Sequence, residues 1–416
     1  MLIVRSAGRA VGTLHTDERE LVLGYAPEWL ASHDAFALSP RLPLQAEPWR
    51  GEEVLSFFAN LLPEGPVLDA LCRLRRLPRG NVYRLLEAFG RECAGAFELV
   101  PQDDTGARAP GYRAYTPDVL SADLQALRNN VPLLQSHDEL RLSLAGAQNK
   151  IPVAWRDGTL WLPTGGAAST HILKPPLQPD SVYPDSVYNE ALCMRLAAAL
   201  GLPVAGVQVI TDPEPLLLIE RFDRVIEGVR VQRIHQLDFC QLSGLLPDQK
   251  YEADGGPGFS DLFALVDTHS ALPARDRLQL VDWLIFNVLI GNADAHGKNI
   301  SMLYGPDGRL RLAPAYDLVA TAYWPQLSDK LAMAIGGERR PDGLMARHWR
   351  SLSDAAGLNF AQLRRRAIEL SAAAVARLPE AITGLQLDSE ARLTRHLTSV
   401  LASRMRQFEA RLRGQG

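Results

Sequence analysis

The sequence predicts an α+β protein in which a strand-rich part is followed by a helical part. Up to about residue 225, short apolar runs alternate with polar turns, which is typical of strands. From there on the apolar residues recur at helical spacing, most strongly over 275–289. With 416 residues the chain is long enough for two or three folding units, so we expect two lobes.

Composition places the chain among ordinary globular proteins. It is 47% hydrophobic and 22% charged, which excludes a collagen, a coiled-coil rod and a disordered tail protein. A formal charge of −4 argues against a nucleic-acid coat, although it is compatible with a local basic patch. The four cysteines form no CxxC pair, so we expect reduced thiols in a cytoplasmic protein. The longest apolar stretch, 280–290, is far shorter than the roughly 20 residues of a membrane span, and no signal peptide is expected.

The first part of the chain predicts a small α+β unit and a connection. Apolar residues on both sides of a polar turn at 16–19 predict strands. Residues 101–111 are rich in Pro, Gly and Asp, which is typical of a linker. Helical spacing of apolar residues predicts three helices, at 51–62, 81–89 and 117–129.

The middle of the chain predicts the strands of the first lobe. Asp157-Gly158 has the composition of a two-residue hairpin turn, so a strand is expected on each side. Residues 186–200 predict a helix, with Ser186 as its N-cap and Gly201 after its end. Further short strands are expected at 171–174, 207–210 and 215–220.

Terminal helices are expected at 358–376 and 387–412. The predicted division has four parts: an N-terminal subdomain, a linker with one helix, the core of the first lobe and an all-helical second lobe, at 1–100, 101–140, 141–225 and 226–416.

An Asp, an Asn and a second Asp follow the apolar helix in the order that phosphoryl transfer uses. Asp294 and Asn299 are five residues apart, and Asp317 lies beyond a predicted hairpin. In kinases the first Asp deprotonates the attacking hydroxyl, and the Asn and second Asp hold Mg²⁺ against the phosphates. Taken alone, D-x-x-x-x-N is also a common loop pattern.

Upstream residues supply the other parts of a kinase site. Lys174 ends a predicted strand and Glu190 lies on the next helix, as do the Lys and Glu that hold ATP phosphates in protein kinases. The alternative is a surface lysine and a glutamate favoured by the helix dipole. Gly146 stands among small residues, where backbone N–H groups can approach a phosphate. Residues 220–223 follow a strand as a hinge would, the alternative being a strand end with a solvated run of charges.

Several long and unusual segments are spread over nearly the whole chain. They are FFANLLPEG (57–65), SLAGAQNK (143–150), HILKPP (171–176), NEALC (189–193), ERFDR (220–224), KYEADGGPG (250–258), GNADAHGKN (291–299), PAYDL (314–318) and KLAMAIGG (330–337). In these segments the chain resembles the HipA family of serine/threonine-protein kinase toxins.

The resemblance implies a bilobal protein-kinase-like fold with a strand-rich N-lobe and an all-helical C-lobe. It also implies that ATP and Mg²⁺ are used in the cleft between the lobes. Asp294 would be the catalytic base with His296 beside it, and Asn299 and Asp317 would be the Mg²⁺ ligands. Ser143 matches the serine that the family autophosphorylates, which ejects the loop and inactivates the kinase. The residues expected at the nucleotide are Ala145, Gly146, Ala147, Gln148, Lys174, Glu190, Glu220, Phe222 and Lys298.

The resemblance further implies a growth-arresting toxin that phosphorylates a translation component, with glutamyl-tRNA synthetase as the leading candidate. A HipB-like helix-turn-helix antitoxin would neutralise it and carry most of the contact with operator DNA. Residues 338–416 hold 14 arginines and 8 acidic residues, and the run Arg364–Arg366 is either a solvated helix face or a surface for DNA phosphates. Two other functions stay open: a small-molecule kinase of the aminoglycoside or choline type, and a catalytically silent corepressor.

Overall fold

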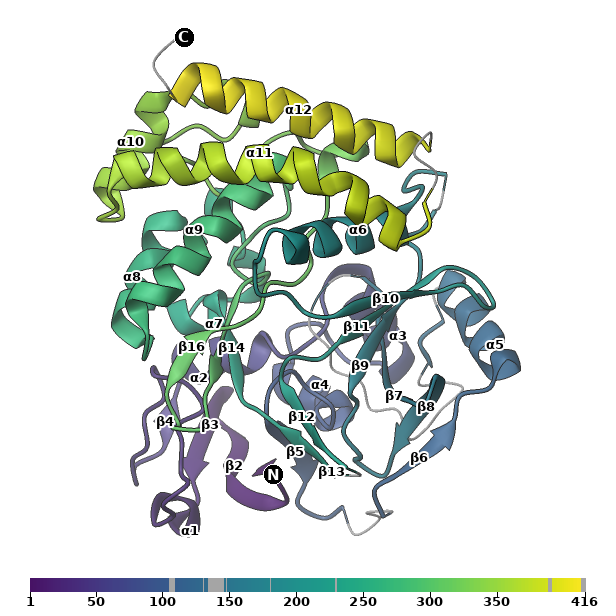
Figure 1. The fold of residues 1–416 in the computed structure, drawn as a ribbon. Helices are drawn as coiled ribbons and strands as arrows, with labels where there is room; N and C mark the ends of the chain where they lie inside the picture. Colours follow the sequence, from purple (N-terminus) through teal and green to yellow (C-terminus); the bar gives the residue numbers. More distant parts are fainter. Residues whose placement is uncertain are drawn as a thin grey trace. The chain divides into compact units, whose positions relative to one another are not determined.

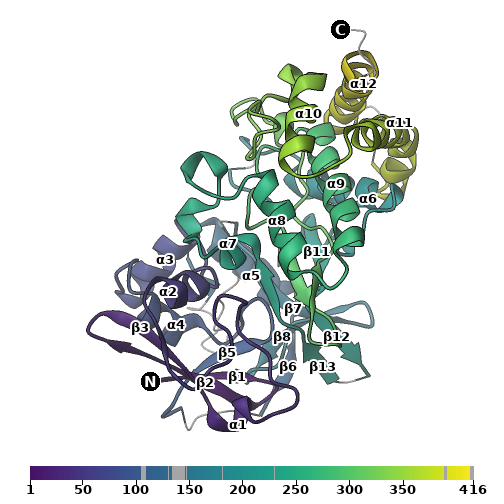
Figure 2. The same cartoon turned by 90° about the vertical axis from the view of Figure 1, so that its left-hand side faces the viewer.

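The computed structural model describes the chain except for residues 105–108, 130, 134–145, 147, 180, 229, 388–390 and 413–416. The chain forms two compact units. Unit 1 contains residues 1–175, 210–247 and 303–308, and unit 2 contains 176–209, 248–302 and 309–416. Figures 1 and 2 show their elements in two views.

The first sheet of unit 1 has five strands in the order β4-β3-β2-β1-β5, with antiparallel neighbours. Glu18 and Arg19 both have positive φ and form the tight turn between β2 and β3, so the polar turn predicted there is confirmed. Helices α2, α3 and α4 lie together on one side of these strands (Figure 2). The elements are β1 (Leu2–Ser6), β2 (Arg9–Asp17), β3 (Glu20–Tyr25), α1 (Pro27–Leu30), β4 (Trp49–Arg50), α2 (Glu52–Ala59), α3 (Gly65–Arg75), α4 (Val82–Phe89) and β5 (Phe97–Pro101).

The second sheet has six strands in the order β10-β11-β9-β7-β8-β6. All of its strands belong to unit 1 except β10, of which only the last residue, Ile210, is in unit 1. Asp157 and Gly158 have φ of 49° and 75°, as a two-residue I′ hairpin turn requires, so the predicted hairpin is confirmed. Helix α5 buries Leu120 and Leu124 in the same core as the strands β7 and β8. The elements are β6 (Gly111–Ala114), α5 (Pro117–Arg128), β7 (Ile151–Arg156), β8 (Thr159–Thr164), β9 (His171–Lys174), β10 (Val207–Ile210) and β11 (Leu216–Glu220).

The segment that was expected to be all-helical also contains short strands, which corrects that part of the prediction. Tyr304 at the end of β15 donates its backbone N–H to His235 at 2.9 Å in unit 1, and Ala313 donates to Ser301 at 2.9 Å in unit 2. The apolar runs in these strands are only three or four residues long. Runs of this length are too short for their periodicity to distinguish a strand from a helix. The elements are β12 (Arg224–Glu227), β13 (Arg230–Arg233), β14 (Gln236–Asp238), α7 (Phe239–Ser243), β15 (Ser301–Tyr304) and β16 (Leu310–Leu312).

Unit 2 is built mainly of helices around the buried α9. Helices α11 and α12 run side by side in both views (Figures 1 and 2). Helix α11 continues past its predicted end at 376 and through Pro379, because buried Leu378, Ala381 and Ile382 extend its apolar face. The helices are α6 (Ser186–Ala199), α8 (Phe259–His269), α9 (Pro273–Ile290), α10 (Ala346–Ala355), α11 (Phe360–Gly384) and α12 (Arg392–Leu412), with short 3₁₀ turns at 247–249, 252–254, 321–323 and 341–343.

The start of α6 differs from the prediction. Asp185, not Ser186, occupies the N-cap position, with a left-handed φ of 58°. The Ser186 hydroxyl instead accepts the backbone N–H of Leu177 at 2.9 Å. The serine therefore fixes the preceding loop onto the helix.

Candidate active site

The segment 291–299 is positioned by the end of α9. Gly291 takes a left-handed φ of 68° there, which a side chain would resist. Asn292 is 1% exposed and its amide nitrogen donates to the Asn287 side chain at 2.8 Å. Its carbonyl oxygen accepts the backbone N–H of Asp294 at 3.0 Å. The turn that presents Asp294 is thus anchored to the last part of the helix.

The carboxylate of Asp294 is oriented by two neighbours. The Tyr251 hydroxyl donates a hydrogen bond to its Oδ1, and His296 Nε2 lies 3.6 Å from the same oxygen. His296 Nδ1 accepts the backbone N–H of Lys298 at 3.3 Å, so the neutral ring carries its proton on Nε2. The Asp294 side chain is 49% exposed, which leaves it accessible to a reacting group.

Asn299 and Asp317 lie on segments that are tied to each other. The Asn299 amide nitrogen donates to the Asp294 backbone oxygen at 2.7 Å, so its carbonyl oxygen is left as the atom for a cation. The Tyr316 hydroxyl donates to the Lys298 backbone oxygen at 2.7 Å. Asp317 has a φ of 57°, which a non-glycine residue adopts only at a cost and which is common at functional sites.

This donor set fits Mg²⁺ held jointly with nucleotide phosphates. A carboxylate and an amide oxygen are hard ligands, and Mg²⁺ is often bound by one or two carboxylates together with substrate phosphates. In the part of the chain that the structure describes, no group of three or more His, Cys, Asp or Glu side chains is placed to hold a metal. The oxygens of Asn299 and Asp317 are of the type that Mg²⁺ takes from a protein when phosphates supply further ligands.

Helix α6 is locked to the segment that follows Asp317. The Asn189 side chain donates to the Ala320 backbone oxygen at 3.1 Å and accepts the Ala320 N–H at 2.9 Å. Glu190, the next residue, is 4% exposed. The Thr321 hydroxyl accepts the Ala293 N–H at 2.7 Å, so the same segment also holds the turn before Asp294. Asn189 and Thr321 were not predicted, because their partners are far away in the sequence.

Unit 1 carries the remaining described residues of the predicted nucleotide site. Lys174 is 4% exposed at the end of β9 and pairs in register with Leu217. The Gln148 amide donates to the Pro175 backbone oxygen at 3.2 Å. Gly146 has a φ of 113°, which L side chains rarely adopt, so the backbone conformation favours glycine here. The predicted residues Ser143, Ala145 and Ala147 lie outside the described residues.

The predicted hinge holds a buried ion network that the sequence did not reveal. Glu220 is exposed and Phe222 is half-buried, but Arg221 and Asp223 are 4% and 2% exposed, which rules out a solvated run of charges. The Arg221 guanidinium bonds Asp223 at 2.7 Å and Glu92 at 2.9 Å. The signal was missed because Glu92 is 129 residues away and reads as an ordinary helix-end acid.

In this network the arginines lower the pKa of the two carboxyl groups by more than their desolvation raises it. Desolvation raises the pKa of Glu92, but the guanidinium groups of Arg233, Arg224 and Arg221 lower it to about 2. Asp223 behaves alike: burial opposes the shift, and the arginines bring its pKa to about 2. Both carboxylates are therefore ionised at neutral pH.

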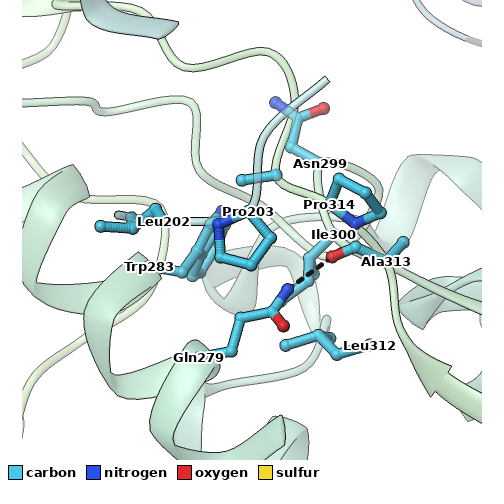
Figure 3. Close-up of a pocket in the computed structure, with 10 residues that line it drawn as sticks. Leu202, Pro203, Gln279, Trp283, Asn299, Ile300, Leu312, Ala313 and Pro314 are labelled. Atoms are coloured by element: carbon cyan, nitrogen blue, oxygen red, sulfur yellow. Dashed lines mark hydrogen bonds between the residues drawn. The ribbon is translucent and has the colours of Figure 1, made fainter. Parts of the chain in front are cut away.

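A small cavity lies beside Asn299 in unit 2 (Figure 3). Its volume of about 10 Å³ has room for about one water, so it does not accommodate a nucleotide. Gln279 closes one wall by donating to the Ala313 backbone oxygen at 2.8 Å. In Figure 3 the Asn299 amide points away from the other lining side chains.

The arginine run on α11 is only partly solvated. The Arg366 guanidinium donates two hydrogen bonds to the Asp282 carboxylate, from Nε at 2.6 Å and from Nη2 at 2.7 Å. This bidentate pair connects α11 to α9. Arg364 and Arg365 are exposed, and Arg365 lies 3.7 Å from Glu369.

Over the described residues, no helix is both long and apolar enough to cross a membrane.

Unit 2 thus brings together Asp294, His296, Lys298, Asn299 and Asp317 on neighbouring segments. Tyr251 joins them and was missed as an individual residue, although the segment KYEADGGPG around it belongs to the family resemblance. A contact of its side chain with Asp294 cannot be inferred from sequence separation alone.

The chain is similar to known proteins over nearly its whole length. The family model of the HipA-like C-terminal domain matches residues 142–381, and that of the HipA N-terminal domain matches residues 2–100. The putative kinase Y4mE of Sinorhizobium fredii is 42% identical over 94% of this chain and 95% of its own length. The serine/threonine-protein kinase toxin HipA of Shewanella oneidensis is 32% identical over 85% of this chain and 84% of its own.

A solved structure of the Shewanella oneidensis HipA, HipB and operator DNA complex contains a similar chain. The TM-score is 0.85 at 29% identity, and the match covers 100% of this chain and 99% of that one. The predicted family and the predicted kinase-like α+β fold are therefore confirmed, and a kinase of this family uses ATP. The chain belongs to the HipA family and is a HipA-like serine/threonine kinase.

Proposed function

We propose that this chain is the toxin of a HipBA-type toxin–antitoxin module. It transfers the γ-phosphate of ATP to a serine or threonine. In this proposal Asp294 is the catalytic base, and Asn299 and Asp317 bind Mg²⁺. One observation carries the site assignment. The oriented carboxylate of Asp294 and the oxygen ligands of Asn299 and Asp317 lie on segments that are joined by hydrogen bonds through Asn299 and Tyr316. This set matches the parts that phosphoryl transfer requires.

The proposed chemistry uses this chain's own residues to position and to take up a proton. Among the described residues no hydrogen bond falls on Asp294 Oδ2, so that oxygen takes the hydroxyl proton of the substrate. The hydroxyl oxygen bonds to the γ-phosphorus as the bond to the oxygen of ADP breaks. Mg²⁺, when bound, neutralises charge on the phosphates. Lys174 and Glu190 would hold the α- and β-phosphates, and Lys298 would contribute a second cation.

The remaining nucleotide contacts are also part of the proposal. Glu220 and Phe222 would lie at the adenine, and the segment from Ala145 to Gln148 would cover the phosphates. Phosphorylation of Ser143 would place a dianion beside the bound nucleotide, and the repulsion would eject the segment and switch the kinase off. Ser143 lies outside the described residues, so its modification is a prediction from the sequence.

The proposed antitoxin and DNA partners follow from a similar solved complex, and the proposed substrate follows from the family resemblance. The similar Shewanella oneidensis chain was solved with HipB and its operator DNA, so we propose a HipB-like helix-turn-helix antitoxin in a cytoplasmic complex. Operator DNA would be bound mainly through that antitoxin. Glutamyl-tRNA synthetase is the proposed substrate, and growth arrest would follow from its modification.

The experiment is transfer of labelled γ-phosphate from ATP to purified glutamyl-tRNA synthetase. We expect label on the synthetase with the parent chain, and at least a hundredfold less with Asp294→Asn or Asp317→Asn. The matched control is Asp354→Asn, an exposed aspartate of α10, which should retain activity. Label on an aminoglycoside or choline instead of any protein would favour a small-molecule kinase, and absence of ATP binding would favour the silent corepressor.

A further inference from the structure

We infer that Tyr251 is a positioning residue for the base: its hydroxyl holds Asp294 Oδ1 so that Oδ2 faces the substrate hydroxyl. The inference rests on the proposed function, because it takes Asp294 as the base. It assigns a role in catalysis to the loop 250–258, which precedes α8 and is distant in sequence from the other site residues.

Two contacts place Tyr251 on one side of the carboxylate. Its hydroxyl donates to Asp294 Oδ1, and its ring meets the His296 ring edge-on, with centroids 5.0 Å apart and an interplanar angle of 86°. His296 Nε2 lies 3.6 Å from the same Oδ1. Tyrosine and histidine therefore converge on a single oxygen, and their mutual packing fixes the direction from which they approach it.

The backbone around Tyr251 is held tightly. Its carbonyl oxygen accepts the N–H groups of Asp254 and Gly256, each at 2.9 Å. A Cβ at Gly256 would lie 2.2 Å from the Gln249 backbone oxygen, so glycine is required for this close turn. The Lys250 backbone oxygen accepts the Gly297 N–H at 3.1 Å. The loop and the segment 291–299 are thus bonded through backbone as well as through the side chain.

A third connection leads from this loop to the chain that follows Asp317. Glu252 Oε2 accepts from the Arg339 guanidinium at 3.0 Å and from the Ala334 N–H at 2.5 Å. Residues 331–339 are themselves closed by the bond from Leu331 N–H to the Arg339 carbonyl at 2.8 Å. Tyr251 is therefore fixed between the base and a segment downstream of the proposed metal ligand.

The physical need for such a residue follows from the aspartate itself. The terminal torsion of Asp is broad and roughly two-fold, so a half-exposed carboxylate samples many orientations. Phosphoryl transfer depends mainly on positioning, and small displacements of a reacting group reduce the rate steeply. A hydrogen bond to one oxygen restricts the rotation while the other oxygen stays open for the proton.

The test compares Tyr251→Phe with the parent in steady-state kinase assays. Phenylalanine keeps the ring against His296 and removes only the hydroxyl. We expect kcat to fall about tenfold while KM for ATP stays within about twofold. Tyr115→Phe is the matched control, because Tyr115 donates to Asp123 at 2.7 Å in the core of unit 1, and its kcat should equal that of the parent.

A double mutant separates positioning from a structural effect. If Tyr251 acts through the carboxylate, adding Tyr251→Phe to Asp294→Asn leaves the residual rate unchanged, since residues that act as a unit are not additive. An equal tenfold loss in both backgrounds would overturn the inference. Glu252→Gln, which loosens the same loop, should lower kcat by a smaller factor and serves if Tyr251→Phe fails to fold.

The outcomes distinguish this inference from the proposed function. Full activity of Asp294→Asn would refute Asp294 as base. An inactive Asp294→Asn together with a parental rate for Tyr251→Phe would overturn the role of Tyr251 alone.

Discussion

Asp317 combines a proposed ligand with a strained backbone. Its φ of 57° costs an ordinary residue about 1–2 kcal/mol that glycine does not lose. Asp317→Gly and Asp317→Ala both lack the carboxylate, so both should be inactive, but the glycine variant should resist urea better by about 1 kcal/mol. Equal urea midpoints for the two variants would contradict this account of the backbone.

His235 gives the stability of unit 1 a pH dependence. Burial lowers the pKa of His235 to about 4 from 6.5, and the hydrogen bond from Nε2–H to the Leu38 oxygen at 2.7 Å only partly offsets this. Between these two pH values the unfolded chain binds a proton that the folded chain does not, so stability falls as the pH falls. The loss amounts to about 2 kcal/mol at about pH 5.

The measurement for this pH effect is urea unfolding near neutral pH and near pH 5 for the parent and His235→Gln. The variant lacks the titrating ring and should lose less stability on acidification. Identical losses in the two proteins would assign the acid sensitivity to other groups.

At the residue scale, the sequence nominates site residues where chemistry imposes an order along the chain, and their roles stay predictions. Asp294, Asn299 and Asp317 are recognisable because phosphoryl transfer needs those types in that sequence. Tyr251 was beyond reach, because its bond to Asp294 spans 43 residues and tyrosine has many other uses. Ser186 was assigned to the wrong position because Asp185 next to it is an equally good cap by composition.

At the element scale, a buried ion network connects the turn after α4 with the strand-rich part of unit 1. Glu92, on the turn after α4, accepts from Arg233 at 2.6 Å and from Arg221 at 2.9 Å, both on the strand-rich part. Glu92→Gln removes the charge and leaves buried arginines unbalanced, so unfolding stability should fall by about 3–5 kcal/mol.

The control for this prediction is Glu87→Gln, which breaks a surface pair with Arg84 and should cost less than about 1 kcal/mol. Urea unfolding of both variants gives the comparison. A similar small cost for both would mean that the network contributes little.

The network itself was not predictable, since charged residues are usually exposed and nothing local marks the exceptions.

Elements with strong local signals were predictable and those fixed by packing were not. The Asp157-Gly158 turn determines its hairpin through positive φ at both positions. Helix α11 continues through Pro379 because its apolar face stays buried on both sides of the proline, although a proline usually ends a helix. The short strand β15 depends on its partners and carries no pattern long enough to recognise, whereas β16 belongs to the hairpin that was expected before Asp317.

At the scale of the whole molecule, sequence segments spread over nearly the whole chain identified the family, while the predicted division at 100, 140 and 225 stays a prediction. The charge of the C-terminal region has a testable consequence for DNA binding. Because operator DNA is proposed to bind mainly through the antitoxin, the double variant Arg364→Ala, Arg365→Ala should leave the salt dependence of operator binding by the toxin–antitoxin complex unchanged.

The readout is the slope of log affinity against log salt concentration. A slope reduced by about one for each arginine would show direct contact with phosphates and contradict this prediction. Arg366→Ala is not informative for DNA, because its guanidinium is bound to Asp282 and its loss changes packing.

The most direct test of the central claim is the intact mass of the phosphate-free protein after incubation with ATP and Mg²⁺. The account predicts that the parent gains one phosphate and that Asp294→Asn and Ser143→Ala gain none. Phosphate gained by Asp294→Asn as fast as by the parent would contradict the assignment of Asp294 as the catalytic base.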